Sequence, residues 1–259
     1  MSELRPSEPV LLVDSRGRRH LVRLAPGASF HTHSGIVEHD QLIGRPDGVV
    51  VRSSGGARYT AMRPTLAQFV LEMPRGAQVI YPKDLGAILM LADVYPGARV
   101  LEAGVGSGAL SLALLRAGAL VVGYELRPEF AAVAAANVAA MGLERHYRVE
   151  VRDVYAGTEE RGLDRVVLDL PEPWRVVGHA AEALRPGGLL VAYLPTINQT
   201  AELRQALSAS AFGLAETLEV LERRWHIEGR SVRPDHRMVA HTGFLTSARL
   251  LEREQERGP

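Results

Sequence analysis

Hydrophobic and polar positions change their spacing near residue 65, and this change divides the chain into two parts. Before it, short stretches alternate between the two kinds of residue, and glycine-containing turns separate them, at residues 14–17, 45–48 and 53–56. Short strands joined by such turns are typical of an antiparallel sheet. We therefore predict a small N-terminal β domain at residues 1–64, with strands at residues 11–13, 20–24, 49–52 and 57–62.

Beyond residue 65, the pattern favours helices and strands in alternation. We predict helices at residues 65–73, 84–95, 109–118, 127–142 and 201–210, and one more that ends at residue 184. The strands lie at residues 99–104, 120–125, 147–153, 165–170 and 189–195. This alternation predicts an α/β domain at residues 65–259, with a parallel sheet and helices on both faces. Two final strands, at residues 215–225 and 239–251, are joined by an arginine-rich loop.

The composition restricts the chemistry. The 259 residues include no cysteine, which excludes disulfides, a thiolate nucleophile and a cysteine-built zinc site. No apolar run approaches the roughly 20 residues that cross a bilayer, and the N-terminus lacks the features of a signal peptide. We therefore expect a cytoplasmic protein without a membrane partner. His31, His33 and His39 have a metal-like spacing, but we predict that they serve packing or a subunit interface and that no metal is bound.

A glycine-rich turn follows one of the predicted strands directly. Gly104, Gly106 and Gly108 stand between a strand that ends at Glu102 and the next helix. This spacing allows a sharp turn whose backbone N–H groups face a ligand. Gly104, Gly106 and Ala109 also satisfy the relaxed dinucleotide fingerprint G-x-G-x-x-G/A, so an NAD-dependent oxidoreductase stays open as an alternative.

Acidic residues close four successive strands of the predicted sheet: Glu102, Glu125, Asp153 and Asp169. The carboxyl ends of parallel strands form the ligand crevice, so we expect these side chains to share one site. Glu125 lies about 20 residues after Gly104, where an acid that binds ribose hydroxyls belongs. That position suits NAD and S-adenosylmethionine equally, but an acidic crevice favours the sulfonium and ammonium groups of S-adenosylmethionine over a pyrophosphate.

The form E-x-G-x-G-x-G resembles the first motif of class I S-adenosylmethionine-dependent methyltransferases. More narrowly, FHTHSG, IYPKD, VLEAGVGSG, YELRPE, LDLPEPW, VAYLP and HTGFL, in this order, resemble the bacterial and archaeal tRNA (adenine-N1)-methyltransferases that modify adenosine 58 in the T-loop. The resemblance implies a Rossmann-like class I methyltransferase sheet, S-adenosyl-L-methionine as cofactor, tRNA as substrate and a homotetramer. It assigns cofactor binding to Glu102, Gly104, Gly106, Ser107, Gly108, Ala109, Leu110, Glu125, Asp153 and Asp169.

The resemblance also implies where the acceptor base lies. Asp169 in LDLPEPW would face the base, and Tyr81 and Tyr193 would line its pocket. N1 of adenine already carries a lone pair, so no strong base is needed. A carboxylate near the exocyclic amine can orient the ring and stabilise the positive charge that develops on it. Trp174 is predicted to be part of the core.

Two groups of arginines are candidates for tRNA phosphate contacts: Arg16, Arg18, Arg19 and Arg23, and then Arg223, Arg224, Arg230, Arg233 and Arg237. Acidic residues interrupt the second group, so a solvated loop is its alternative. Two other functions compete with methyl transfer. A hydride-transferring enzyme is disfavoured because Lys83, the only lysine, precedes the glycine turn. A non-catalytic tRNA-binding subunit would be expected to lose the glycines or Asp169, and this chain keeps them.

Overall fold

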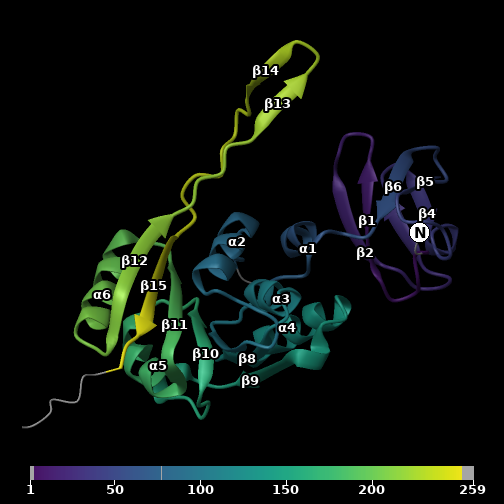
Figure 1. Ribbon diagram of the computed structural model, residues 1–259. Coiled ribbons are helices and arrows are strands. Elements are labelled where there is room, and N and C mark those ends of the chain that lie inside the picture. The colour runs from purple at the N-terminus through teal and green to yellow at the C-terminus, as the bar shows by residue number, and fades with distance from the viewer. Residues whose placement is uncertain (1–2, 77, 253–259) are drawn as a thin grey trace, which may run out of the picture. The chain divides into compact units, whose positions relative to one another are not determined.

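The computed structural model describes residues 3–76 and 78–252, which form two compact units (Figure 1). Within this range, the first unit comprises the residues up to 75 together with 136–142, and the second comprises the rest. The domain boundary predicted at residue 64 stays a prediction. None of the helices in the described ranges has the length and apolar content that a membrane span requires.

The first unit is built around an antiparallel sheet in the order β2-β1-β6-β5. The strands are β1 (Pro9–Asp14), β2 (Arg19–Arg23), β5 (Val49–Arg52) and β6 (Arg58–Met62). Their antiparallel pairing confirms the sequence prediction. Val10, Leu12 and Ala61 are among the residues of its buried core. A capping box between Thr65 and Gln68 starts α1 (Leu66–Glu72).

A further hairpin in this unit was not predicted. It consists of β3 (Ser29–Thr32) and β4 (Gly35–Glu38), followed by the 3-10 helix η1 (His39–Gln41). A Cβ atom on Gly35, whose φ is 102°, would lie 2.5 Å from the backbone nitrogen of Gly55. The hairpin is therefore held by a close backbone approach between two turns. Strands of four residues with largely half-buried side chains are too short to show a clear alternation.

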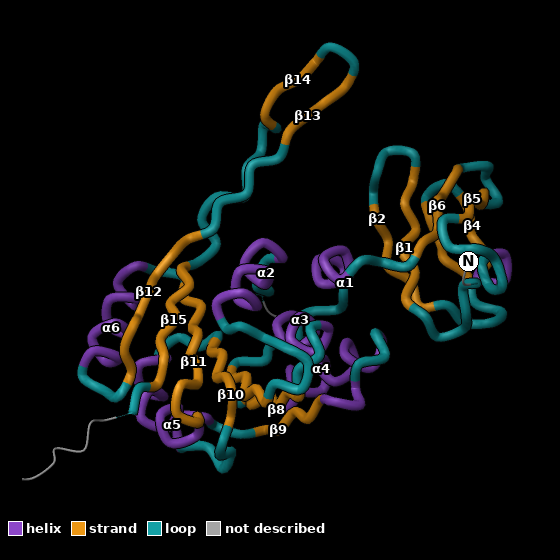
Figure 2. Tube along the Cα trace, viewed as in Figure 1, coloured by secondary structure: helices purple, strands orange, loops and turns teal. Residues whose placement is uncertain are grey.

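The second unit contains a seven-stranded sheet in the order β12-β15-β11-β10-β7-β8-β9 (Figure 2). The strands that pair in parallel are β7 (Arg99–Ala103), β8 (Leu120–Glu125), β9 (Tyr147–Val151), β10 (Leu163–Leu168) and β11 (Leu184–Leu194). At one edge, β15 (Phe244–Leu250) runs antiparallel to both of its neighbours, β11 and β12 (Phe212–Glu219). This confirms the predicted α/β sheet. The chain proceeds outward from β7 to one side and from β10 to the other, so the switch point, where parallel sheets bind ligands, lies between these strands.

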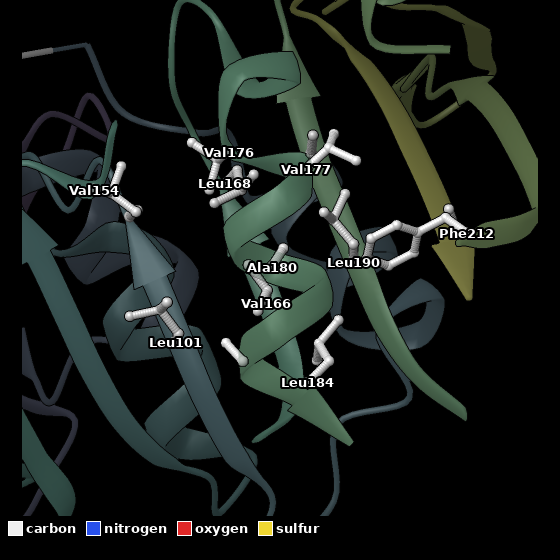
Figure 3. Close-up of a cluster of buried hydrophobic side chains, with 14 of the residues drawn as sticks. Leu101, Val154, Val166, Leu168, Val176, Val177, Ala180, Leu184, Leu190 and Phe212 are labelled. Atoms are coloured by element: carbon white, nitrogen blue, oxygen red, sulfur yellow. The ribbon is translucent and has the colours of Figure 1, made fainter. Parts of the chain in front are cut away.

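Helices cover both faces of this sheet. Side chains of α5 (Val177–Ala183) and α6 (Ile197–Ser208) join those of the sheet in one buried cluster, shown in Figure 3. Leu101 of β7 points into this cluster, so its neighbour Glu102 points to the opposite face. There Ser111 of α3 (Ala109–Arg116) donates a hydrogen bond to Glu102, which places α3 on that face. The remaining helices of the unit are α2 (Pro82–Leu91) and α4 (Pro128–Ala140), whose last part belongs to the first unit.

The predicted C-terminal arrangement needs a correction. The segment predicted as a loop forms a hairpin of β13 (Trp225–Glu228) and β14 (Ser231–Pro234), whose turn contains Gly229 at a φ of 54°. The two strands predicted to flank it are correspondingly shorter, since β12 ends at Glu219 and β15 begins at Phe244. In Figure 1 the hairpin extends away from the seven-stranded sheet. The segment was predicted as a loop because of its arginines, although its apolar residues alternate as is typical of a strand.

Candidate active site

The glycine turn follows β7 and contacts the ends of its two neighbouring strands, β8 and β10. Gly104, Gly106 and Gly108 all have positive φ angles, of 85°, 54° and 85°. A Cβ atom on Gly104 would collide with the carbonyl oxygen of Asp169, the residue that follows β10. The backbone N–H of Gly104 donates to Tyr124 at 3.0 Å, and that of Asp169 donates to Ala103 at 2.9 Å. Residue 104 must therefore be glycine, because the backbone of Asp169 occupies the space that a side chain would need.

A cavity of about 270 Å³ lies beside this turn. Five of the predicted cofactor residues line it: Gly104, Gly106, Glu125, Asp153 and Asp169. The sequence interpretation missed the other lining residues, which are Gln78, Tyr124, Leu126, Arg127, Arg152, Val154, Tyr155, Leu170 and Pro171. Most of these residues stand next to a predicted acid in the chain, so their position at a strand end could have identified them as lining residues.

Glu125 is fixed by the backbone around it. Its carboxylate accepts hydrogen bonds from the N–H groups of Gly106 at 2.9 Å and Arg127 at 3.0 Å, and its side chain is buried. Asp153 is exposed and caps a short 3-10 helix by accepting from the N–H of Tyr155 at 2.9 Å. Each acid is therefore held in one orientation at its strand end.

The other predicted cofactor residues do not line this cavity. Ser107, Gly108, Ala109 and Leu110 are buried at the start of α3, because the first turn of this helix packs into the core. Glu102 is fully buried beneath the turn, where its Oε2 accepts from Ser111 at 2.6 Å. Among the described residues, its Oε1 has no hydrogen-bond partner. No feature of the sequence pattern indicates that this acid lies below the turn instead of at its surface.

Burial and neighbouring negative charges raise the pKa of two acids at the site. Burial raises the pKa of Glu102 to about 8, and the negative charge of Asp169 adds to the shift while the hydrogen bond from Ser111 opposes it. Burial likewise raises the pKa of Asp169 to about 7, and the charge of Glu125 contributes. A positive charge placed among these groups would favour their ionised forms.

A second cavity, of about 630 Å³, holds the predicted acceptor residues together. Tyr81, Tyr193 and Asp169 all line it, as do Gln78, Val79, Ile80, Pro195 and residues 238–242. Tyr193 belongs to β11, which pairs with β10 in parallel. Asp169 and Gln78 line both cavities. Asp169 is therefore a wall residue of both cavities.

The segment after Asp169 is stiffened by contacts as well as by its prolines. The carbonyl of Pro171 accepts from Gln199 at 3.0 Å, and the N–H of Glu172 donates to the Tyr155 hydroxyl at 3.2 Å. Trp174 is partly buried against the hydrophobic core, as predicted. The strand end thus presents Asp169 on a rigid backbone.

The histidines and arginines singled out in the sequence are dispersed over the first unit and the C-terminal hairpin. His31 contacts Ser29, His33 contacts Arg18, and buried His39 accepts from the N–H of Ala25. Within the described ranges, no group of side chains is suited to hold a metal ion. Arg18 pairs with Asp14 at 2.6 Å and Arg224 with Glu222 at 2.6 Å, and both arginines are exposed, as are Arg16, Arg19, Arg223, Arg230 and Arg237.

Comparisons with known proteins agree with this geometry. Residues 59–234 match the family described as the tRNA methyltransferase complex GCD14 subunit, and residues 3–51 match the TrmI-like N-terminal family. The tRNA (adenine(58)-N(1))-methyltransferase TrmI of Thermus thermophilus is 44% identical over 93% of this chain and 96% of its own length. The chain belongs to the TrmI family of tRNA methyltransferases.

Solved structures also resemble this TrmI-family chain over nearly its full length. An S-adenosylmethionine-dependent O-methyltransferase of Thermotoga maritima matches with a TM-score of 0.92 and 35% identity, over 98% of this chain and 96% of the other. The tRNA (m1A58) methyltransferase TrmI of Aquifex aeolicus matches with a TM-score of 0.85 and 30% identity, over 97% and 100% of the two chains. The predicted class I methyltransferase fold and its cofactor class are thereby confirmed.

The raised pKa of Glu102 predicts a pH-dependent stability. Because the folded pKa of about 8 lies above the ordinary value of 4.5, the folded protein holds a proton that the unfolded chain releases. The free energy of unfolding therefore decreases as pH rises through this window. Glu102→Gln removes the titration, so urea unfolding at several pH values should show a smaller decrease in the variant. Glu129→Gln, which changes an exposed carboxylate, is the control and should follow the parent. A Glu102→Gln curve parallel to that of the parent would contradict this assignment.

Proposed function

We propose that this chain transfers a methyl group from S-adenosylmethionine to N1 of adenosine 58 in the T-loop of tRNA. The observation that carries the proposal is that Asp169 lines both cavities. A group transfer between two bound molecules needs the donor and the acceptor to meet at one point. The 44% identical relative from Thermus thermophilus carries this activity in its name.

The smaller cavity fits S-adenosylmethionine in charge and in hydrogen-bonding groups. Glu125 offers carboxylate oxygens suited to ribose hydroxyls, and the glycine turn offers a backbone surface without side chains. Burial raises the pKa of Asp169, which lines this cavity, and of Glu102 beneath the turn, and a cationic ligand would favour the ionised form of both acids. When bound, S-adenosylmethionine supplies a methyl group activated by its sulfonium.

In the larger cavity, Asp169 would orient the base and balance its charge. N1 of adenine is already nucleophilic, so the carboxylate need not remove a proton. It would accept a hydrogen bond from the exocyclic amine and stabilise positive charge on the methylated ring. Burial raises the pKa of Tyr193 to about 12, so its phenol stays neutral at physiological pH and can serve only as a hydrogen-bonding and packing group. Tyr81 would contribute a second ring. Because adenosine 58 lies within the folded tRNA, the base must be extruded to enter the cavity.

A second candidate is methyl transfer to oxygen, because the Thermotoga maritima structure is titled an O-methyltransferase. A hydroxyl acceptor would need a base to remove its proton, and Asp169 with a pKa of about 7 is suited to that task as well. Mapping the modified nucleosides in tRNA after incubation with labelled cofactor separates the two functions. The proposal expects 1-methyladenosine at position 58, whereas a ribose-methylated nucleoside would overturn it.

Asp169→Asn tests the role of the carboxylate at the junction of the cavities. Asparagine is nearly isosteric but removes the negative charge and replaces an acceptor by a donor. We expect the single-turnover rate of tRNA methylation to fall about 10²- to 10³-fold, roughly 3–4 kcal/mol of barrier. Asp153→Asn is a matched control, because Asp153 lines only the smaller cavity. That variant should change cofactor affinity and leave the rate at saturating cofactor intact. Asp169→Asn methylating within about threefold of the parent would exclude a catalytic role, since such a change is far below that range.

Gly106→Val tests the cofactor cavity. The residue has a φ of 54° and lines the cavity, so valine would both strain the turn and fill space that the cofactor needs. Calorimetry should show loss of S-adenosylmethionine binding by a folded variant. Gly142→Val is the control, because Gly142 has a similar φ of 67° and a Cβ there would meet open space. Unchanged cofactor affinity in Gly106→Val would place the cofactor elsewhere.

We also propose that the protein acts as a homotetramer in the cytoplasm and that its two arginine groups contact tRNA phosphates. The C-terminal hairpin supports assembly. Its pairs Trp225–Pro234 and Ile227–Val232 share one face, and Trp225, Ile227 and Val232 are 58%, 71% and 61% exposed. An isolated two-stranded hairpin is marginally stable, so an exposed apolar face of this kind favours a protein partner.

Ile227→Glu should therefore reduce the oligomer. A charge on the apolar face opposes burial, so light scattering should show a smaller assembly than that of the parent. Ser231→Glu places the same charge on the opposite face of the hairpin and should leave the parent's mass unchanged. A parent protein that is monomeric in solution would contradict the proposed tetramer.

A further inference from the structure

Tyr193 is held in the acceptor cavity by the backbone of two consecutive residues. Its hydroxyl donates a hydrogen bond to the carbonyl oxygen of Thr242. Its ring lies close to Gly243, where a Cβ atom would come within 2.5 Å of two ring carbons. The backbone of Gly243 needs no positive φ, so its lack of a side chain serves the approach of the ring and not the path of the chain.

Thr242 is in turn anchored by a buried ion pair. Lys83 and Asp84, at the start of α2, are 2.8 Å apart, and their side chains are 4% and 0% exposed. Lys83 donates to the Thr242 hydroxyl at 2.6 Å, and this hydroxyl donates to Asp84 at 2.6 Å. Lys83 also donates to the carbonyl of Val220 at 2.6 Å. The hydroxyl of Thr242 therefore connects the carbonyl that holds Tyr193 to a rigid, fully partnered network.

His241 fixes the same segment on the other side of Tyr193. Its Nδ1 lies 2.7 Å from Glu219, and its Nε2 lies 2.8 Å from the carbonyl oxygen of Pro195, two residues beyond Tyr193. Both partners are acceptors, so the ring satisfies both only when both nitrogens carry protons. The hydrogen bond to Glu219 raises the pKa of His241, while the charge of Lys83 opposes the shift.

We infer that the segment His241-Thr242-Gly243 is a positioning element for the tyrosine of the larger cavity: it fixes the ring and hydroxyl of Tyr193, and Lys83 and Asp84 fix the segment. The inference rests on the proposed methyl transfer and assigns roles to the IYPKD and HTGFL motifs beyond that of Tyr81. His241 and Thr242 also line the larger cavity, so together with their effect on Tyr193 these residues should affect the placement of the base and not the binding of the cofactor. Within the described residues, the smaller cavity is lined by none of them.

Gly243→Ala tests the contact with the ring. The added methyl group would displace Tyr193, and a misplaced base contact should lower the single-turnover methylation rate roughly tenfold or more, with unchanged S-adenosylmethionine affinity. In a Tyr193→Ala background the ring is absent, so Gly243→Ala should cause no further loss of rate. Gly178→Ala, at a site with open space around it, is the control and should behave as the parent. Equal losses of rate with and without the Tyr193 ring would overturn the inference.

Thr242→Val tests the contacts of the Thr242 hydroxyl with Lys83 and Asp84. It still tests the inference if Gly243→Ala does not fold. It removes the hydroxyl held by Lys83 and Asp84 and keeps the carbonyl. Thr200→Val is the matched control, since Thr200 is a buried threonine whose hydroxyl donates to Thr196 in α6. A fluorotyrosine label at position 193 should show an altered fluorine resonance in Thr242→Val and not in Thr200→Val. An unaltered resonance overturns this inference, whereas a parent protein that makes no 1-methyladenosine overturns the proposed function instead.

Discussion

The close approach of Gly104 to the backbone of Asp169 is the constraint on which the site depends. It occurs between β7 and β10, where the strand order changes direction, and it leaves no space for any side chain at residue 104. One result is that the glycine turn and the acid of the next strand are held at a fixed separation. Another is that Asp169 borders both the cavity beside the turn and the cavity beyond it. A single backbone contact therefore places Asp169 against both cavities, as the proposed methyl transfer requires.

The same closeness has an electrostatic cost. Glu102 lies fully buried under the turn, the backbone of Asp169 lies against Gly104, and Glu125 accepts a hydrogen bond from the N–H of Gly106. Burial, together with the negative charges nearby, raises the pKa of Glu102 to about 8 and that of Asp169 to about 7. A neutral cofactor would leave this repulsion in place, but a sulfonium would reduce it. The cost of placing these acids together is thus consistent with selection for a cationic ligand, and it argues against a pyrophosphate in the cavity.

Much of this arrangement could be predicted because local sequence determines it. Alternating helices and strands specify a parallel sheet, and the carboxyl ends of its strands gather at one edge, so Glu125, Asp153 and Asp169 were expected together. Tyr81 and Tyr193 were expected near Asp169 from the family resemblance, and the larger cavity contains all three. The depth of Glu102 could not be predicted, because the strand end leaves open which face its side chain takes relative to α3. The hairpin at residues 225–234 was missed because its charged residues resemble those of a solvated loop.

The polar network around Thr242 could not have been predicted from sequence patterns. Lys83 and Asp84 are adjacent in the chain, but their partners Val220 and Thr242 lie more than a hundred residues away. No periodicity or spacing joins such positions, because their proximity arises only when β15 pairs with β11 and brings the preceding segment beside α2. A buried charge pair is tolerated there because every polar group has a partner. The antiparallel strand that distinguishes this sheet from a purely parallel one thus has a direct effect on the site: the residues leading into it form the wall against which Tyr193 rests.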